Sequence, residues 1–109
     1  KSVSRILFLG WCSSDKHEKL LCAADIYLQP GTQSVTMQQS MGARCALILD
    51  DVPSHRIYIK NNGWLLNNQQ SLDKVLRECM TSDLNQMKQN SFELAKEFLD
   101  YNILSRFVF

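Results

Sequence analysis

The stretch "QPGTQSVTMQQSMGARCALILD", residues 29–50, decides the fold that we expect for this chain. It starts where the apolar run "DIYLQ" ends, and Pro30-Gly31 stops that run as a turn stops a strand. The segment "SVTMQQSMGA", residues 34–43, has the spacing of a helix with Ser34 as its N-cap. Its expected packing residues are Val35, Met37 and Met41. The apolar run "CALIL", residues 45–49, follows and predicts a buried strand.

The sequence on both sides continues this alternation of strands and helices. "RILFLGW", residues 5–11, predicts a strand buried on both faces, and residues 13–24 predict a helix capped by Ser13 or Ser14. After a less regular piece, "GWLL" predicts a short fourth strand. Residues 71–79 and the segment from Asp83 predict helices. The order predicts an α/β fold: a Rossmann-like, three-layer α/β/α domain with a mostly parallel sheet, spanning residues 1–109 as a single domain.

Composition restricts the partners that we expect. Twelve basic and eleven acidic residues leave a net charge of +1, and no block of Lys or Arg predicts binding to nucleic acid. The apolar runs are too short to cross a bilayer, and the N-terminus does not have the pattern of a signal peptide. We therefore expect no transmembrane segment and a cytoplasmic location.

The cysteines and histidines predict no chemistry of their own. Cys12, Cys22, Cys45 and Cys79 contain no CxxC pair, so we expect reduced and mostly buried thiols. A metal site that includes His17 would need a spacing that fits no common zinc pattern. Neither histidine has an acid at a suggestive distance in the sequence, and we expect both on the surface. Trp64 is expected in the core.

Parallel sheets bind ligands at the carboxyl ends of their strands. Three loops would lie at that edge, namely residues 10–14, 30–34 and 50–54. The helix that starts after Pro30-Gly31 would point free backbone amides and its positive dipole end toward the same edge. The residues alone therefore predict a domain that could bind a phosphate group.

The order of four motifs resembles the C-terminal half of retaining GT-B glycosyltransferases of group 1, most closely those of bacterial surface-polysaccharide assembly. The motifs are "ILFLG", "EKLLCAADIYLQPG", "SVTMQQSMGARCALIL" and "NNGWLL". The matching positions are Ala23-Ala24-Asp25, Pro30-Gly31, Ser40-Met41-Gly42 and Asn62-Gly63. The resemblance covers nearly the whole chain. In that family this half binds the nucleotide-sugar donor.

The resemblance implies a donor site in this chain. Its expected residues are Gly10 and Trp11 for the base, Gly31, Thr32, Gln33, Ser34 and Val35 for the diphosphate, and Gln39 for the ribose. The two glutamates that many family members carry align with Gly31 and Gln39, so both acids are absent. The donor would be a UDP or GDP sugar. No cofactor, metal or catalytic residue is expected in the chain.

The resemblance also implies that the chain is a fragment of a two-domain enzyme. Family members have two further strand-helix units and an acceptor-binding domain before the part that corresponds to Lys1. We expect the full-length protein to transfer sugar to a glycan or lipid-linked acceptor, in the cytoplasm or at the inner face of the membrane. The fragment would be inactive by itself.

Two alternatives stay open. "LILDD", residues 47–51, has the acid pair of phosphoacceptor receiver domains, but it follows the third expected strand rather than the first. The other alternative is a non-catalytic Rossmann-like interaction module, which the two missing acids favour.

Overall fold

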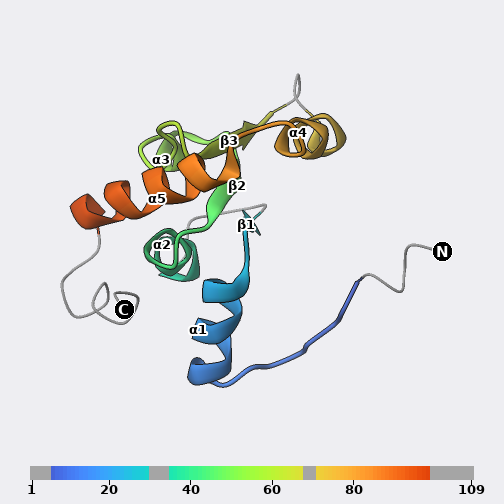
Figure 1. The fold of residues 1–109 in the computed structure, drawn as a ribbon, viewed down its shortest axis with the longest axis vertical. Coiled ribbons are helices and arrows are strands. Elements are labelled where there is room, and N and C mark those ends of the chain that lie inside the picture. The colour runs from blue at the N-terminus through green and yellow to red at the C-terminus, as the bar shows by residue number, and fades with distance from the viewer. Residues whose placement is uncertain (1–5, 30–34, 68–70, 99–109) are drawn as a thin grey trace.

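Three short parallel strands form the centre of the computed structural model, which describes residues 6–29, 35–67 and 71–98 (Figure 1). The strands are β1 (Ile26–Gln29), β2 (Ala46–Asp50) and β3 (Gly63–Leu66), in the order β1-β2-β3. Ile26 lies opposite Ala46 in the first pair, and Leu47 lies opposite Gly63 in the second. The α/β class and the parallel sheet predicted from the sequence are confirmed.

In the described part of the chain, five helices precede, connect or follow the strands. They are α1 (Ser14–Ala23), α2 (Val35–Gly42), α3 (Pro53–Arg56), α4 (Leu72–Cys79) and α5 (Leu84–Phe98). The hydroxyl group of Ser13 caps α1 by accepting the amide of Lys16 at 3.2 Å, and Ser71 caps α4 in the same way. The expected cap of α2, Ser34, lies outside the described residues.

The middle strand carries the core on both of its faces. Leu47 and Leu49 pack toward α2 and α5, and Ile48 packs toward α4. The larger cluster is built from fully or nearly buried residues, which are Met37, Met41, Leu47, Leu49, Tyr58, Leu94 and Ala95. The smaller one consists of Ile48, Val75 and Cys79, with Trp64 packed against it. Helices therefore cover both faces of the sheet, and the predicted packing roles of Met37 and Met41 are confirmed.

The strand expected at residues 5–11 is wrong for the part that the structure describes. Residues 6–11 form no strand, and their apolar side chains are exposed, with Leu7 79% and Phe8 91% accessible. An apolar run becomes a buried strand only where a neighbouring strand supplies hydrogen bonds and other elements cover its faces. Residues 6–11 have neither within the described part of the chain.

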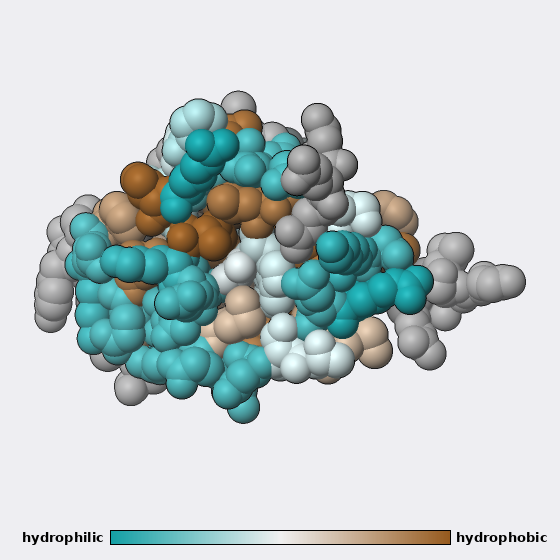
Figure 2. All heavy atoms as spheres, turned by 90° about the horizontal axis from the view of Figure 1, so that it is seen from above, coloured by the Kyte–Doolittle hydropathy of each residue, from teal (hydrophilic) through white to brown (hydrophobic). Residues whose placement is uncertain are grey.

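Apolar groups also remain accessible elsewhere on the surface. On the face shown in Figure 2, brown apolar side chains lie between teal polar ones, so polar groups do not cover this face completely. The exposed apolar residues outside the segment 6–11 include Leu28, Ile57, Leu76 and Met80.

Candidate functional site

A surface hollow of about 340 Å³ lies where the loop before α1 meets the first turn of α2. Its lining residues are Gly10, Trp11, Cys12, Ser14, His17 and Thr36. Two segments that are 25 residues apart, at Trp11 and Thr36, therefore contribute to one concave surface. Its lining combines the apolar ring of Trp11 with polar groups, namely the hydroxyls of Ser14 and Thr36 and the imidazole of His17.

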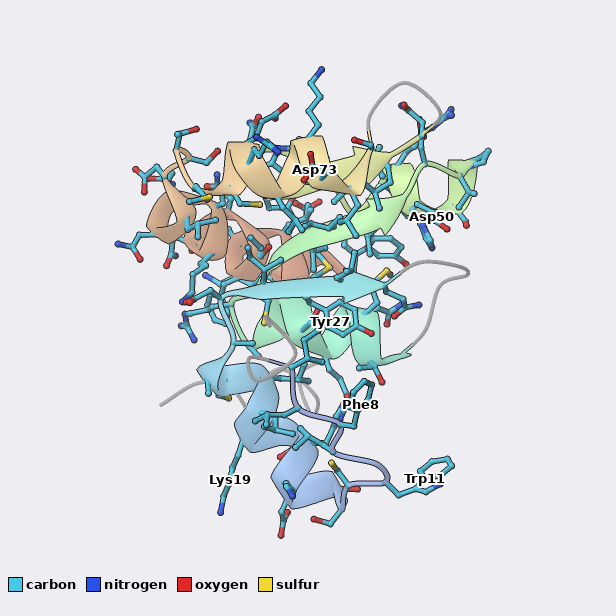
Figure 3. The ribbon with its side chains drawn as sticks, turned by 90° about the vertical axis from the view of Figure 1, so that its right-hand side faces the viewer. Phe8, Trp11, Lys19, Tyr27, Asp50 and Asp73 are labelled. Atoms are coloured by element: carbon cyan, nitrogen blue, oxygen red, sulfur yellow. The ribbon has the colours of Figure 1, made fainter. Side chains whose placement is uncertain are left out.

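Among the described residues, Gly10 and Trp11 of the predicted donor site line the hollow. Gly10 adopts a left-handed backbone with a φ of 65°, and this conformation favours glycine. The side chain of Trp11 is fully exposed and extends away from the body of the molecule (Figure 3). An exposed indole ring beside this hollow can stack on a planar or apolar group of a ligand.

The other predicted site residues are placed less completely. Gly31, Thr32, Gln33 and Ser34 lie outside the described residues, and Val35 is described only as the first residue of α2. Gln39 is half-buried in the middle of α2 and is not among the residues that line the hollow. The structure brings Gly10 and Trp11 to the start of α2 but does not bring Gln39 to the same hollow.

The hollow lies near the N-terminal ends of two helices. Ser14 is the first residue of α1, and Thr36 is the second residue of α2. The unpaired amides and the positive dipole end of a helix start favour an anion. Asp15 in the first turn of α1 opposes this effect with its own negative charge. The arrangement suits a small polar or anionic group held by amides and hydroxyls.

The carboxyl end of β2 carries a second cluster of polar groups. The guanidinium of Arg56 donates to Asp51 Oδ1 at 2.8 Å, and the amide of Asn67 donates to Asp51 Oδ2 at 3.4 Å. These two hydrogen bonds, that of Arg56 first, hold the pKa of the Asp51 carboxyl below its usual value. The loop that follows β2 is therefore tied to the end of β3.

His55 lies in this cluster and is fully buried, so its expected surface position is wrong. Its Nδ1 atom lies 2.8 Å from the carbonyl oxygen of Asp50. The short helix α3 turns the ring inward at the end of β2. Neither Asp50 nor Asp51 stands at a spacing that predicts a pair with His55, and a bond to a backbone carbonyl leaves no signature in residue types.

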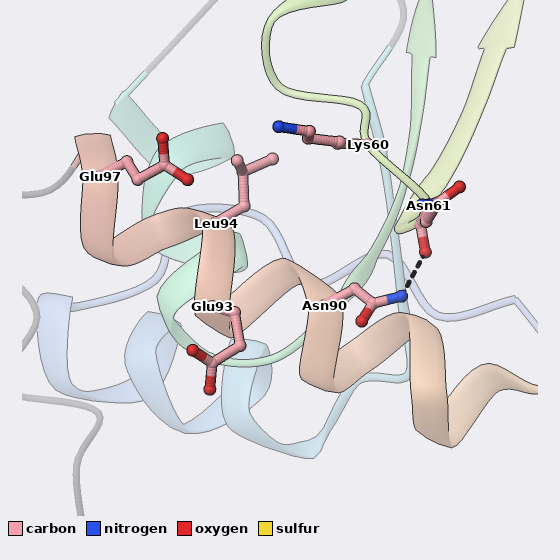
Figure 4. Close-up of a pocket in the computed structure, with 6 residues that line it drawn as sticks. All are labelled: Lys60, Asn61, Asn90, Glu93, Leu94 and Glu97. Carbon is pink, nitrogen blue, oxygen red and sulfur yellow. Dashed lines mark hydrogen bonds between the residues drawn. The ribbon is translucent and has the colours of Figure 1, made fainter.

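A hollow of about 360 Å³ at the amino end of β3 was not predicted (Figure 4). Its lining residues are Lys60, Asn61, Asn90, Glu93, Leu94 and Glu97. Asn90 donates its amide to the carbonyl oxygen of Asn61 at 2.7 Å, which joins α5 to the turn before β3. This hollow lies at the opposite end of the strands from the edge where parallel sheets bind ligands.

The motifs that carry the family resemblance have structural roles in this fold. Asp25 forms an ion pair with Lys88 of α5 at 2.8 Å, and the Ser40 hydroxyl donates to the carbonyl oxygen of Met37 at 2.6 Å. Asn62 is fully buried and donates to Tyr58 O and Ser91 Oγ. These positions hold the elements together and do not line the hollow near Gly10.

The structure also places Gln38, the cysteines and Trp64. Gln38 is half-buried and donates its amide to the Tyr58 hydroxyl at 3.3 Å, because α2 packs beside Tyr58. Cys45 and Cys79 are buried and Cys22 is exposed, so the prediction of mostly buried thiols holds for only some of them. Trp64 is half-buried against the core and donates its indole N–H to Glu78.

Residues 6–29, 35–67 and 71–98 contain no group of three or more His, Cys, Asp or Glu side chains that could hold a metal ion. Within the same ranges, no helix is long and apolar enough to span a membrane. Comparison with known proteins found no matching protein family, curated protein or solved structure.

Proposed function

We propose that this chain is the donor-binding part of a glycosyltransferase that moves a sugar from a nucleoside diphosphate sugar to a glycan or lipid-linked acceptor. The observation that carries the proposal is the hollow in which Gly10 and Trp11 meet Thr36. The loop of Gly10 and Trp11, which the family resemblance assigns to donor binding, borders this hollow, and Thr36 belongs to the helix that follows the second such loop in the sequence. The parallel sheet with helices on both faces is the kind of scaffold that this function requires.

Each part of the hollow suits one part of such a ligand. The ring of Trp11 offers a flat surface for the base, and the amides at the starts of α1 and α2 suit the diphosphate. In sugar transfer the diphosphate leaves with a negative charge, and preorganised amides would stabilise that charge. Gln39 would need to reach the ribose from the middle of α2, which makes it the least supported of the proposed contacts.

An amide NMR titration of the 109-residue chain with UDP and, separately, GDP tests the proposal. We expect shifts at Gly10, Trp11 and Thr36 that saturate with one of the two ligands. Amides of α4, such as those of Val75 and Cys79, lie on the other face of the sheet and serve as the internal control. The variant Trp11→Ala should weaken binding roughly tenfold, since stacking on one aromatic ring contributes about 1–3 kcal/mol.

The exposed side chain of Trp11 makes this variant informative about binding rather than folding, because its removal leaves no cavity. A matched control is Met80→Ala, which removes another exposed apolar side chain far along the sequence. Shifts that spread evenly over the chain, or the absence of shifts at millimolar ligand, would contradict the proposal. If the wild-type chain and Trp11→Ala bind with equal affinity, the base does not bind at this loop.

One observation favours a second candidate, the non-catalytic interaction module. The side chains of Ile6, Leu7, Phe8, Leu9 and Trp11 are all exposed. Contiguous exposed apolar groups mark surfaces that contact other proteins. If UDP and GDP give no shifts while the chain self-associates or binds a partner through this segment, the second candidate replaces the first.

A further inference from the structure

The buried imidazole of His55 has a hydrogen-bonding capacity that the fold does not use. Nδ1 lies 2.8 Å from the carbonyl oxygen of Asp50, and a carbonyl oxygen only accepts, so Nδ1 carries the proton. In the neutral ring, Nε2 is then a bare acceptor. It is buried and has no hydrogen-bond partner in the described part of the chain.

Both the backbone and the ring of His55 are held by hydrogen bonds. The backbone amide of His55 donates to Val52 O at 2.9 Å, and the amide of Tyr58 donates to His55 O at 3.0 Å. Together with the bond to Asp50, these contacts fix where Nε2 points. A buried polar atom without a partner lowers stability, and an apolar side chain could fill the same space without that loss. An oriented, unused acceptor therefore indicates a partner from outside the described residues.

The position of the ring says what kind of partner fits. His55 follows the carboxyl end of β2, the middle strand of the sheet, where ligands of parallel sheets lie. A bare imidazole nitrogen needs a hydrogen donor. It does not bind a phosphate oxygen, and no cluster of metal-ligating side chains is found among residues 6–29, 35–67 and 71–98. A hydroxyl group meets the requirement.

We propose that Nε2 of His55 accepts a hydrogen bond from a ligand hydroxyl, on either the ribose or the transferred sugar. This inference rests on the proposed function, because the nucleotide sugar supplies the hydroxyl. His55 thereby recognises the ligand by binding one of its hydroxyl groups. It is not among the residues that line the hollow at Gly10 and Trp11.

Access to Nε2 requires a local movement, since the atom is covered in this structure. Helix α3 is a single turn of four residues, and its N-cap Val52 makes no side-chain capping bond. Val52, Pro53 and Ser54 are exposed, so the packing of these three residues does not oppose a shift of this turn. Ligand binding is therefore coupled to a displacement of α3.

The test is a long-range ¹H–¹⁵N spectrum of the histidine rings in the 109-residue chain. It is recorded without ligand, with UDP, with a UDP sugar, and then with GDP and a GDP sugar. Without ligand we expect a proton on Nδ1 of His55 and the resonance of a bare Nε2. A shift of Nε2 toward a hydrogen-bonded acceptor on adding UDP identifies a ribose hydroxyl. A shift that appears only with the nucleotide sugar identifies the sugar.

Two substitutions separate recognition from folding. His55→Asn keeps an amide donor near the place of Nδ1, so the bond to Asp50 can persist, but it removes the Nε2 acceptor. It should weaken binding roughly tenfold, as expected for one lost hydrogen bond to a ligand. Ser54→Ala, on the exposed side of the same turn, should bind as the wild-type chain does.

The outcomes distinguish this inference from the proposed function. If ligand shifts the amides of Gly10 and Thr36 but leaves Nε2 unchanged, the inference is overturned and the donor site stands. If Nε2 is already hydrogen-bonded without ligand and its resonance does not change on adding ligand, its partner is a buried water and the inference is overturned. Absence of any ligand shift overturns both. If His55→Asn does not fold, the ring spectrum of the wild-type chain decides alone.

Discussion

A side chain on Gly63 would collide with the backbone of Leu47. A Cβ atom built on Gly63 would lie 2.0 Å from the carbonyl oxygen of Leu47, its partner across the β2–β3 pair. The glycine of the "NNG" motif is therefore explained by the close approach of two backbones. It is required at this position by the sheet, whatever the chain binds.

We predict that Gly63→Ala destabilises the chain by roughly 2–4 kcal/mol, because β3 must move away from β2 to make room. Denaturant unfolding followed by circular dichroism measures the loss. Gly10→Ala is the matched control. A Cβ there meets no atom within 4 Å, and only the left-handed φ of 65° opposes it, at a cost of about 1 kcal/mol. A loss at Gly63 no larger than that at Gly10 would contradict the close packing of the two strands.

A second prediction concerns the buried amide of Asn62, which joins the turn before β3 to α5. It donates to Tyr58 O at 3.0 Å and to Ser91 Oγ at 3.1 Å. Asn62→Ala should cost roughly 2–3 kcal/mol, because the partners remain buried without their hydrogen bonds. Ser91→Ala should cost less, since Tyr58 O still pairs with the amide.

The double mutant tests whether the two side chains act as a pair. We expect Asn62→Ala and Ser91→Ala together to cost less than the sum of the single changes, with a coupling of about 0.5–1.5 kcal/mol. Thermal or urea unfolding of the four proteins gives this value. Strictly additive losses would mean that the hydrogen bond between Asn62 and Ser91 does not contribute to stability.

Most of the fold could be predicted from the sequence because its signals are local. The apolar runs that became β1 and β2 are bounded by Pro30 and by Asp50-Asp51, and serine caps mark the starts of α1 and α4. The segment "RILFLGW" has the same local signal as a buried strand but lacks a partner among the described residues. Strand formation depends on pairing, which no local pattern reports.

The candidate site was predicted only in part, for a related reason. Chain order placed Gly10 and Trp11 near the start of α2, and the hollow brings them to Thr36. His55 was missed because its partner is a backbone carbonyl, which any residue at position 50 would supply. The "AAD", "SMG" and "NG" motifs were visible in the sequence, but their contacts with Lys88, Met37 and Leu47 show that they shape the fold.

A third prediction follows from the thiol of Cys45. Burial raises its pKa from 9.0 to about 11. The unfolded thiol loses its proton near pH 9, whereas the folded one retains it until about pH 11. Between these values the unfolded state binds fewer protons, so the free energy of unfolding falls as the pH rises, by up to about 2–3 kcal/mol.

Comparison with Cys45→Ala isolates this effect from other groups that titrate in alkali. The variant should lose about 1 kcal/mol at neutral pH, and its stability should fall less than that of the wild-type chain between pH 9 and pH 11. Cys22→Ala removes an exposed thiol whose charge adds to the burial effect on the pKa of Cys45, so it should keep most of the wild-type slope. Urea unfolding at several pH values measures all three. Parallel curves for the wild-type chain and Cys45→Ala would show that the thiol is not buried in solution.

The last prediction concerns the exposed segment of residues 6–11. Leu7 is 79% and Phe8 91% accessible, so replacing both with Asp should change stability by no more than about 0.5 kcal/mol. The same change should reduce self-association in light scattering, because it breaks a contiguous apolar surface. Ile48→Ala, in the fully buried middle of β2, should cost about 2–5 kcal/mol. If the double Asp variant loses as much stability as Ile48→Ala, the segment is packed in solution, and the strand that its sequence predicts does form.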